Sequence, residues 1–169
     1  MGLFWIVQTA RLRLTPVSGA DLLDLIALKS DPRVFAIMLG GVRNAARTMD
    51  ELAEDIACWG ANGWGMWTIR ARADGGFVGL TGLMARPDGR GVALRFALRP
   101  EAQGQGLASE AAGAALRYGH GQARLPRIVA VARASNFASR QVLGGIGMTE
   151  AGRFRQGGYD MVLYESIAR

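Results

Sequence analysis

The spacing of apolar residues predicts a strand and then a helix near the start of the chain. Residues 11–16 alternate polar and apolar side chains, which is typical of a strand with one buried face. Residues 22–27 carry apolar side chains at helical spacing, and Ser18 with Asp21 forms a capping-box-like start before them. Pro32 ends this helix, because the residue before a proline avoids helical geometry.

A second helix is predicted to begin at Thr48, which forms a capping box with Glu51. Gly60, Gly63 and Gly65 end this helix. We expect its buried face to consist of Leu52, Ile56 and Trp59.

Three apolar segments between residues 66 and 98 predict consecutive strands. Residues 66–70 and 77–84 flank a turn at 73–76, where glycine supplies a positive φ. A second turn at 87–90 leads into the third strand, residues 92–98. Because both connections are short, the three strands are expected to form an antiparallel meander.

The second half of the chain alternates helices with strands. A glycine-rich turn at 103–106 leads into a long helix, and Gly147 ends a later, shorter helix. The remaining elements are a helix at 107–118, a strand at 127–132, a helix at 136–146 and a hairpin of strands at 149–154 and 159–165. The order βααβββαβαββ predicts an α+β fold, an α/β sandwich with a mixed, mainly antiparallel sheet of about seven strands flanked by about four helices.

Composition fits one domain, residues 1–169, and excludes several kinds of site. Half of the residues are hydrophobic, which is enough for a sizeable core. A single cysteine, Cys58, excludes an internal disulfide and a four-cysteine metal site, and a single histidine, His120, excludes sites with two histidine ligands. We expect no metal, a core position for Cys58 and a surface or helix-end position for His120.

The formal net charge of +6 raises the hypothesis of a nucleic-acid partner. The basic residues are dispersed, however, and all but Lys29 are arginine. Lysine-rich tracts, zinc ligands and an aromatic-basic RNA signature are missing, so no specific nucleic acid is expected. The apolar start at residues 3–7 is short and lacks a basic leader, and no apolar run approaches the ~18 residues of a membrane span. A cytoplasmic protein without a membrane partner is therefore expected.

The glycine turn at 103–106 could hold an anion, because glycines admit close approach and the first amides of a helix are unpaired donors. A tight turn without a ligand is the alternative. A dinucleotide fingerprint fits poorly, because Ser109 stands where the third glycine is needed and three meander strands come first. A P-loop is excluded, since no Gly-Lys-Ser or Gly-Lys-Thr occurs.

Gln103-x-x-Gly106-x-Ala108 matches the Arg/Gln-x-x-Gly-x-Gly/Ala motif of the GCN5-related N-acetyltransferase (GNAT) superfamily. The sequence resembles the ribosomal-protein N-acetyltransferase-like (RimJ/RimL-type) branch of that superfamily over nearly its whole length. Further segments that carry the resemblance are 9–14, 30–32, 65–69, 108–112 and 136–148.

The resemblance implies a GNAT fold and an acetyl-CoA-dependent N-acetyltransferase. It implies that the strand at 92–98 separates from the next strand at a bulge, and that the pantetheine arm of the cofactor fills the gap. A backbone N–H at Leu98 would bind the thioester oxygen. Asn136 would contact the cofactor arm, and a plain helix cap is its alternative role. The implied cofactor-binding residues are Phe96, Ala97, Leu98, Gln103, Gly104, Gln105, Gly106, Leu107, Ala108, Ser109, Asn136 and Ser139.

The sequence departs from the family pattern at the catalytic acid and base. Many members protonate the departing thiolate with a tyrosine seven residues after the asparagine, where this chain has Leu143. Ser139 is the remaining candidate acid, or it only hydrogen-bonds the cofactor. The strand at 92–98 carries no carboxylate, so the base is a water or one of the weaker candidates, namely Glu101, Asp88 and Asp160.

The implied acceptor is a primary amine, either a protein N-terminal α-amine or a small molecule such as a polyamine, an amino acid or an antibiotic. An α-amine, with a pKa near ~8, needs less help from a base than a lysine at ~10.4, which slightly favours an α-amine. Trp64, between two glycines, is a core residue or part of the acceptor pocket. Loss of the tyrosine and of the strand carboxylate also allows a CoA-binding module without catalysis. Relatives suggest a homodimer.

Overall fold

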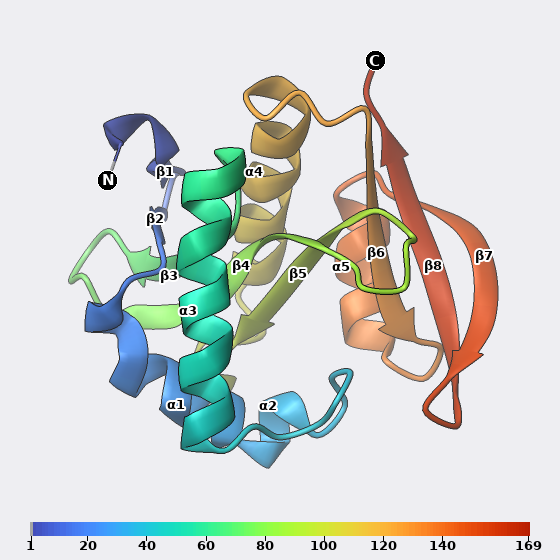
Figure 1. The fold of residues 1–169 in the computed structure, drawn as a ribbon, viewed down its shortest axis with the longest axis horizontal. Helices are drawn as coiled ribbons and strands as arrows, with labels where there is room; N and C mark the ends of the chain where they lie inside the picture. Colours follow the sequence, from blue (N-terminus) through green and yellow to red (C-terminus); the bar gives the residue numbers. More distant parts are fainter. Residues whose placement is uncertain (1) are drawn as a thin grey trace.

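The computed structural model describes residues 2–169, which form one eight-stranded sheet and five α-helices (Figure 1). The strands are β1 (Val7–Gln8), β2 (Leu12–Pro16), β3 (Met66–Ala71), β4 (Phe77–Ala85), β5 (Val92–Leu98), β6 (Arg127–Arg133), β7 (Thr149–Gln156) and β8 (Tyr159–Ile167). The helices are α1 (Leu22–Ser30), α2 (Pro32–Phe35), α3 (Ala45–Asn62), α4 (Leu107–Gly121) and α5 (Phe137–Gly145).

The sheet has the order β1-β2-β3-β4-β5-β6-β8-β7. Every neighbouring pair is antiparallel except β5 and β6, which are parallel and connected through α4. This arrangement confirms the predicted mixed, mainly antiparallel α+β fold. The additions to the prediction are the two-residue strand β1 and the four-residue helix α2.

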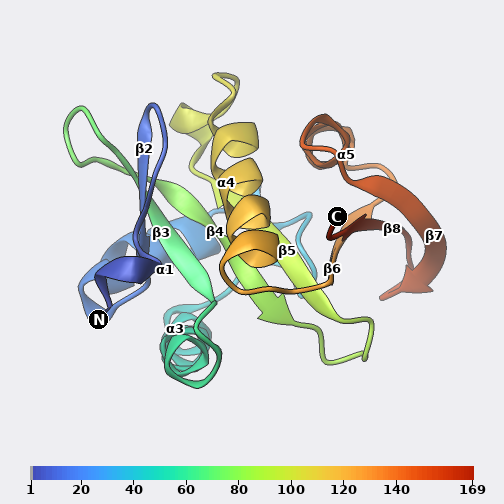
Figure 2. The ribbon, with the colours of Figure 1, turned by 90° about the horizontal axis from the view of Figure 1, so that it is seen from above.

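Helices cover both faces of the sheet, with α4 on one face and α1 and α3 on the other (Figure 2). One core cluster includes Leu94 and Leu98 of β5 with the small residues of α4. The second cluster lies between α1, α2, α3 and the sheet, and it includes Leu80 and Ala97. Because side chains alternate along a strand, β5 contributes to both clusters. The residues of β5 therefore lie between the two halves of the core.

The start of α3 corrects the predicted capping box at Thr48. The helix begins at Ala45, and the side chain of Asn44 accepts the backbone N–H of Arg47 at 2.8 Å. Asparagine is a strong N-cap, so the cap lies at Asn44, four residues before the predicted cap at Thr48. The Thr48 hydroxyl donates to the Asn44 carbonyl instead. Ile56, predicted to be buried, is 43% exposed.

Pro32 ends α1 as predicted and also begins the next helix. Its fixed φ suits the first position of α2, and the Asp31 carboxylate accepts the Arg33 N–H at 2.9 Å. The chain thus turns directly from α1 into α2, which places Phe35 in the core beside β5.

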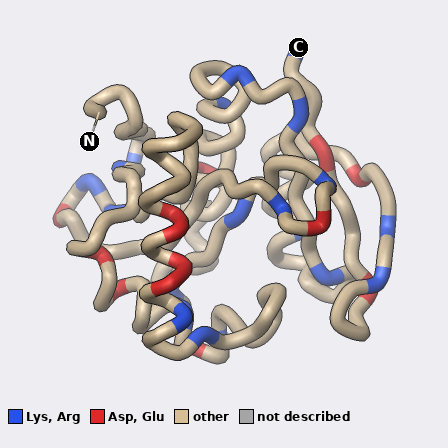
Figure 3. Tube along the Cα trace, in the orientation of Figure 1, with Lys and Arg blue, Asp and Glu red and all other residues tan. Residues whose placement is uncertain are grey.

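Basic positions are distributed along the trace, and acidic positions are scattered too, with several on α3 (Figure 3). Among residues 2–169, no helix combines the length and the apolar character that a membrane crossing requires.

Candidate active site

The parallel strands β5 and β6 separate soon after they meet. They share one register pair in the described chain, Ala93 with Val129, and then diverge (Figure 1). Residues from Leu94 onward in β5 and from Ala130 onward in β6 therefore have no partner across the gap. The pairing of β5 with β4 is regular from Val92 to Leu98, so the bulge expected there is absent. β5 and β6 diverge without it.

A cavity of about 310 Å³ occupies the gap between the two strands. Its walls are formed by Phe96 of β5, Ala132 of β6, and Asn136, Ser139 and Leu143 around α5. Leu143, at the position of the missing tyrosine, presents an apolar side chain to this cavity. Among the described residues that line this cavity, Ser139 is the one whose side chain carries a hydroxyl proton.

The hydrogen-bond ladder of β5 directs one set of amides into the gap. The N–H of Arg99 donates to the carbonyl of Val78 in β4 at 3.0 Å. Because donors alternate along an antiparallel strand, the N–H groups of Phe96 and Leu98 point away from β4 and toward the open side. The Leu98 carbonyl accepts the side-chain amide of Gln103 at 3.0 Å. The Leu98 side chain itself is buried against α4, outside the cavity.

The glycine turn lies at the N-terminus of α4, exposed to solvent. Gly104 and Gly106 have φ values of +78° and +76°, and a Cβ at Gly104 would meet only open space. Arg11 fixes the turn from the side of β2, donating to the Gln105 carbonyl at 2.8 Å and to the carboxylate of Glu110 at 2.7 Å. The turn therefore has an open surface and helix N-terminal donors, which fit a diphosphate.

Asn136 caps α5 and also lies at the wall of the first cavity. Its side-chain oxygen accepts the Ser139 N–H at 3.2 Å, so it caps α5, and its side chain also lines the cavity. The Ser139 hydroxyl is not used by this cap. Arg133, at the end of β6, stacks on the Tyr159 ring at 3.6 Å, and its buried Nε has no partner in the described chain.

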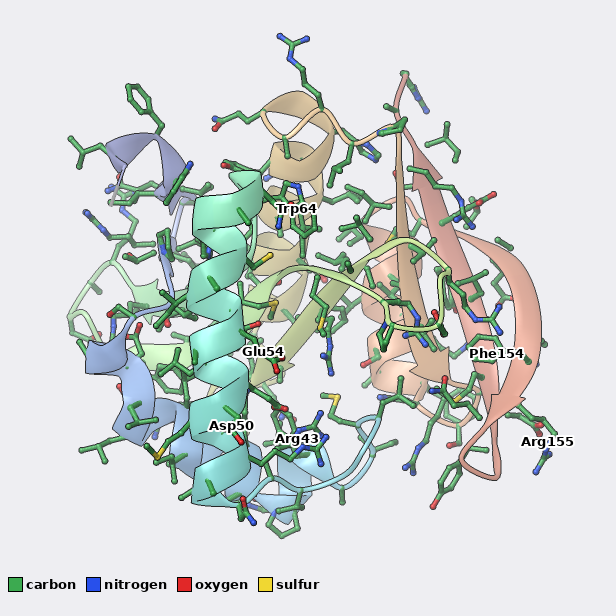
Figure 4. All side chains as sticks on the ribbon, in the orientation of Figure 1. Arg43, Asp50, Glu54, Trp64, Phe154 and Arg155 are labelled. Atoms are coloured by element: carbon green, nitrogen blue, oxygen red, sulfur yellow. The ribbon has the colours of Figure 1, made fainter. Side chains whose placement is uncertain are left out.

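A second cavity of about 370 Å³ adjoins the first on the side of α1, α2 and α3. Phe96 lines both cavities, and Ala97 lines the second. Figure 4 shows the Glu54 and Arg43 side chains on the side of α3 that turns toward β5. The residues shared by the two cavities are Met38, Arg43, Arg47, Met84, Arg95 and Phe96.

Glu51 organises three cations at the base of the second cavity. Its carboxylate lies 3.1 Å from Lys29 Nζ, 3.2 Å from Arg43 Nε and 3.7 Å from Arg47 Nε. Burial would raise the pKa of Glu51, but the neighbouring Lys29 and Arg43 outweigh burial and lower it. This network ties α1 and the loop before α3 to α3 itself.

Asp55, one helical turn beyond Glu51, is a candidate general base that the sequence analysis did not identify. It lines the second cavity, and burial raises its pKa from 3.8 to about 6, against the attraction of Lys29 and Arg95. A carboxyl group that titrates near neutral pH can accept a proton from an amine. The i, i+4 spacing from Glu51 was a visible signal, but such spacing is equally typical of an exposed helix face.

The predicted bases lie elsewhere. Asp88 pairs with Arg86 at 2.6 Å, Glu101 with Arg99 at 3.1 Å, and Asp160 with Arg155 at 2.8 Å, and all three carboxylates lie outside both cavities. These carboxylates have local cationic partners, which suits surface ion pairs better than proton transfer at the site.

Trp64, Cys58 and His120 also lie outside the two cavities. Trp64 packs against the core just after the C-terminus of α3, at the opposite end of that helix from Arg43 (Figure 4). The Cys58 thiol donates to the Trp64 carbonyl at 3.3 Å, and burial raises its pKa. His120, near the end of α4, contacts the Leu125 carbonyl at 2.8 Å and the Ser166 hydroxyl at 2.9 Å.

Comparisons with known proteins agree with this architecture. Residues 11–149 match the family model of the acetyltransferase (GNAT) domain. FsC-acetyl coenzyme A-N(2)-transacetylase of Aspergillus fumigatus is 29% identical over 162 residues, covering 88% of this chain and 66% of that protein, just under two thirds of its length. An acetyltransferase structure from Agrobacterium tumefaciens is 26% identical, with a TM-score of 0.84 and coverage of 95% of this chain and 93% of its own.

The RimL ribosomal L7/L12 alpha-N-protein acetyltransferase, solved with coenzyme A, is 19% identical with a TM-score of 0.80 and shares the fold. It covers 96% of this chain and 98% of its own. Because the family model spans most of the sequence, the predicted resemblance to the GNAT superfamily is confirmed: the chain belongs to the GNAT acetyltransferase family.

Proposed function

We propose that this protein transfers an acetyl group from acetyl-CoA to a primary amine by direct attack within a ternary complex. The proposal is carried by the wall that the two cavities share, which includes Arg95 and Phe96 of β5. One cavity lies between the separating strands, and the other lies under α3. Two substrates bound in these cavities would meet at β5, so no carrier group on the protein is needed.

The residues of the first cavity and of the glycine turn fit acetyl-CoA. The α4 amides at Gly106, Leu107 and Ala108 would hold the diphosphate, and the unpaired edge of β5 would hold the extended arm. When bound, acetyl-CoA supplies an acetyl thioester, whose carbonyl carbon is the electrophile. The N–H of Leu98 points into the gap and would donate to the thioester oxygen as that oxygen gains charge.

Ser139 would supply a proton to the departing sulfur. Its hydroxyl lines the first cavity and is free of the α5 cap, which uses its backbone N–H. The apolar Leu143 beside it excludes water from the same wall.

The amine would enter the second cavity. The names of similar proteins include a ribosomal-protein α-N-acetyltransferase and a spermidine N-acetyltransferase, so both protein and small-molecule amines occur among structures of this fold. The second cavity favours an active transferase over a module that only holds the cofactor, because cofactor storage requires only the first cavity.

Initial-rate kinetics test the direct mechanism. With acetyl-CoA and an accepted amine varied together, we expect intersecting double-reciprocal lines and no acetylated protein in quenched samples. Cys58→Ser should retain turnover, because the thiol lies outside both cavities. Parallel lines with an acetylated side chain would contradict direct attack. Tight acetyl-CoA binding without acetylation of any amine would support the storage module instead.

A further inference from the structure

Asp55 and Arg95 are oppositely charged and line the same cavity, yet neither forms an ion pair within the described residues 2–169. Asp55 is on α3 and Arg95 is on β5, and the cavity separates them. Glu51 binds Lys29, Arg43 and Arg47, and Glu54, the other acidic residue of the cavity wall, is exposed to solvent. The cavity thus keeps one half-buried anion, Asp55, and one half-buried cation, Arg95, available to a bound molecule.

Arg95 faces the acceptor rather than the diphosphate of the cofactor. Its neighbours by strand alternation are Ala93 and Ala97, and Ala97 belongs to the core beneath α1 and α3. Leu94 and Leu98 point to the opposite face, toward α4, whose N-terminus carries the glycine turn. The side chain of Arg95 therefore lies on the other side of the sheet from that turn.

The guanidinium of Arg95 has no anionic partner among residues 2–169. Its hydrogen bond is to the Met84 sulfur at 2.8 Å, a weak acceptor, and burial lowers its pKa. Arginine stays protonated in proteins, and a partly buried cation without a counter-ion is costly. An anionic group on the bound acceptor would offset that cost.

Building on the proposed function, we infer that the acceptor is a small amino carboxylate, with its carboxylate bound by Arg95 and its amine bound by Asp55. The wall also has an apolar part, which includes Phe35, Met66 and Leu80, so an apolar side chain on the acceptor fits. A polyamine fits poorly, because four basic side chains line the cavity against three acidic ones.

Asp55 also accounts for the proton that the amine must lose. The acceptor ammonium gives one proton to the Asp55 carboxylate, and its nitrogen then forms a bond to the acetyl carbon. The carbon–sulfur bond breaks, and the sulfur takes the proton of the Ser139 hydroxyl, which recovers one from the nitrogen. Asp55 releases its proton to water. The products are the N-acetyl amino carboxylate, free thiol and one proton.

Paired acceptors test this inference. We would measure thiol release at saturating acetyl-CoA for apolar L-α-amino acids, for the matching amines without the carboxylate, and for the amino acid amides. The free amino acids should exceed both other groups by roughly 10- to 100-fold in kcat/KM, since a charge-assisted contact is lost in the others. Calorimetric titration of the best amino acid into the protein with CoA gives a second readout, because binding needs no turnover.

Arg95→Gln should reduce the ratio of kcat/KM for amino acids to kcat/KM for their amides to near unity, and it should weaken amino acid binding by a similar factor. Arg95→Lys should keep part of this ratio and part of the binding affinity. Asp55→Asn should lower kcat for every amine. Arg153→Gln, on the distant strand β7, is the matched control and should leave the preference unchanged. Equal rates for amino acids and their amides, or an unchanged preference in Arg95→Gln, would overturn the inference and leave the proposed function standing. Failure of all amines would instead contradict the proposed function.

Discussion

Ala93 of β5 and Val129 of β6 are the one register pair between the parallel strands of the described chain. Beyond them, each strand has an edge of backbone groups that face a cavity rather than a neighbour. An unpaired strand edge is a template for an extended ligand. The extended arm of acetyl-CoA would complete the sheet there, between Phe96 and Ala132.

Gly106→Ala should separate backbone strain from cofactor binding. Gly106 and Gly75 both lie in the left-handed region, at φ +76° and +74°, and alanine at either position is expected to destabilise by about 1–2 kcal/mol. Gly75 lies in the β3–β4 turn, far from α4, and is the matched control. Thermal unfolding should show similar losses, while calorimetry should show weaker acetyl-CoA binding for Gly106→Ala alone. Equal binding in both variants would exclude the glycine turn as the diphosphate site.

Ser139→Ala tests whether Ser139 supplies the proton to the departing sulfur. We expect kcat to fall with little change in acetyl-CoA affinity or stability, because the α5 cap depends on the backbone N–H of Ser139. Asn136→Ala removes the cap oxygen and is expected to destabilise by about 1 kcal/mol. An equal loss of kcat and of acetyl-CoA affinity in Ser139→Ala would mean that this hydroxyl binds the cofactor rather than donating a proton.

Asp55→Asn should stabilise the protein at high pH. The folded-state pKa of Asp55 is raised to about 6, so above that pH the fold holds an ionised carboxylate that burial disfavours. From the shift of roughly two units, the cost is at most about 3 kcal/mol. The melting temperature of the variant should exceed that of the native protein at pH 8, and the difference should vanish below about pH 4, where both folded and unfolded carboxyls are protonated.

The charged groups that line the cavity with Asp55 are Lys29, Arg43, Arg47, Glu51, Glu54 and Arg95. Glu54→Gln changes an exposed neighbour on α3 and should not reproduce the pH-dependent gain. A melting temperature difference for Asp55→Asn that does not vary with pH would show that titration of Asp55 is not the cause.

Glu51→Gln should be strongly destabilising. Lys29 and Arg43, whose side chains are 7% and 4% exposed, would lose their common anion, and breaking a buried pair from one side costs about 3–5 kcal/mol. The pKa of Glu51 is lowered in the fold, so its stabilisation is present at neutral pH and is lost as the pH falls through that lowered value. Denaturant unfolding measures the loss, and Glu165→Gln, in the exposed pair with Arg127, should cost less than about 1 kcal/mol.

Local patterns in the sequence determined the elements of this fold. Alternation predicted β2, and apolar segments between turns predicted β3, β4 and β5. The Gln103–Ala108 motif indicated the family, and Leu143 showed that the usual tyrosine is missing. The start of α3 was misplaced because two caps, Asn44 and Thr48, stand four residues apart, and the competition between them depends on the whole loop.

The acceptor cavity was decided by tertiary structure alone. Asp55 and Arg95 are 40 positions apart, and each reads in the sequence as an ordinary surface charge. The position of α3 across the cavity from β5 partly buries both side chains and removes water from around them. This burial shifts the pKa of Asp55 toward neutrality. The motifs of the cofactor site are contiguous, so they can be recognised in the sequence. Desolvation depends on what surrounds a group in space, so the charge pair of the acceptor site arises only when the chain folds.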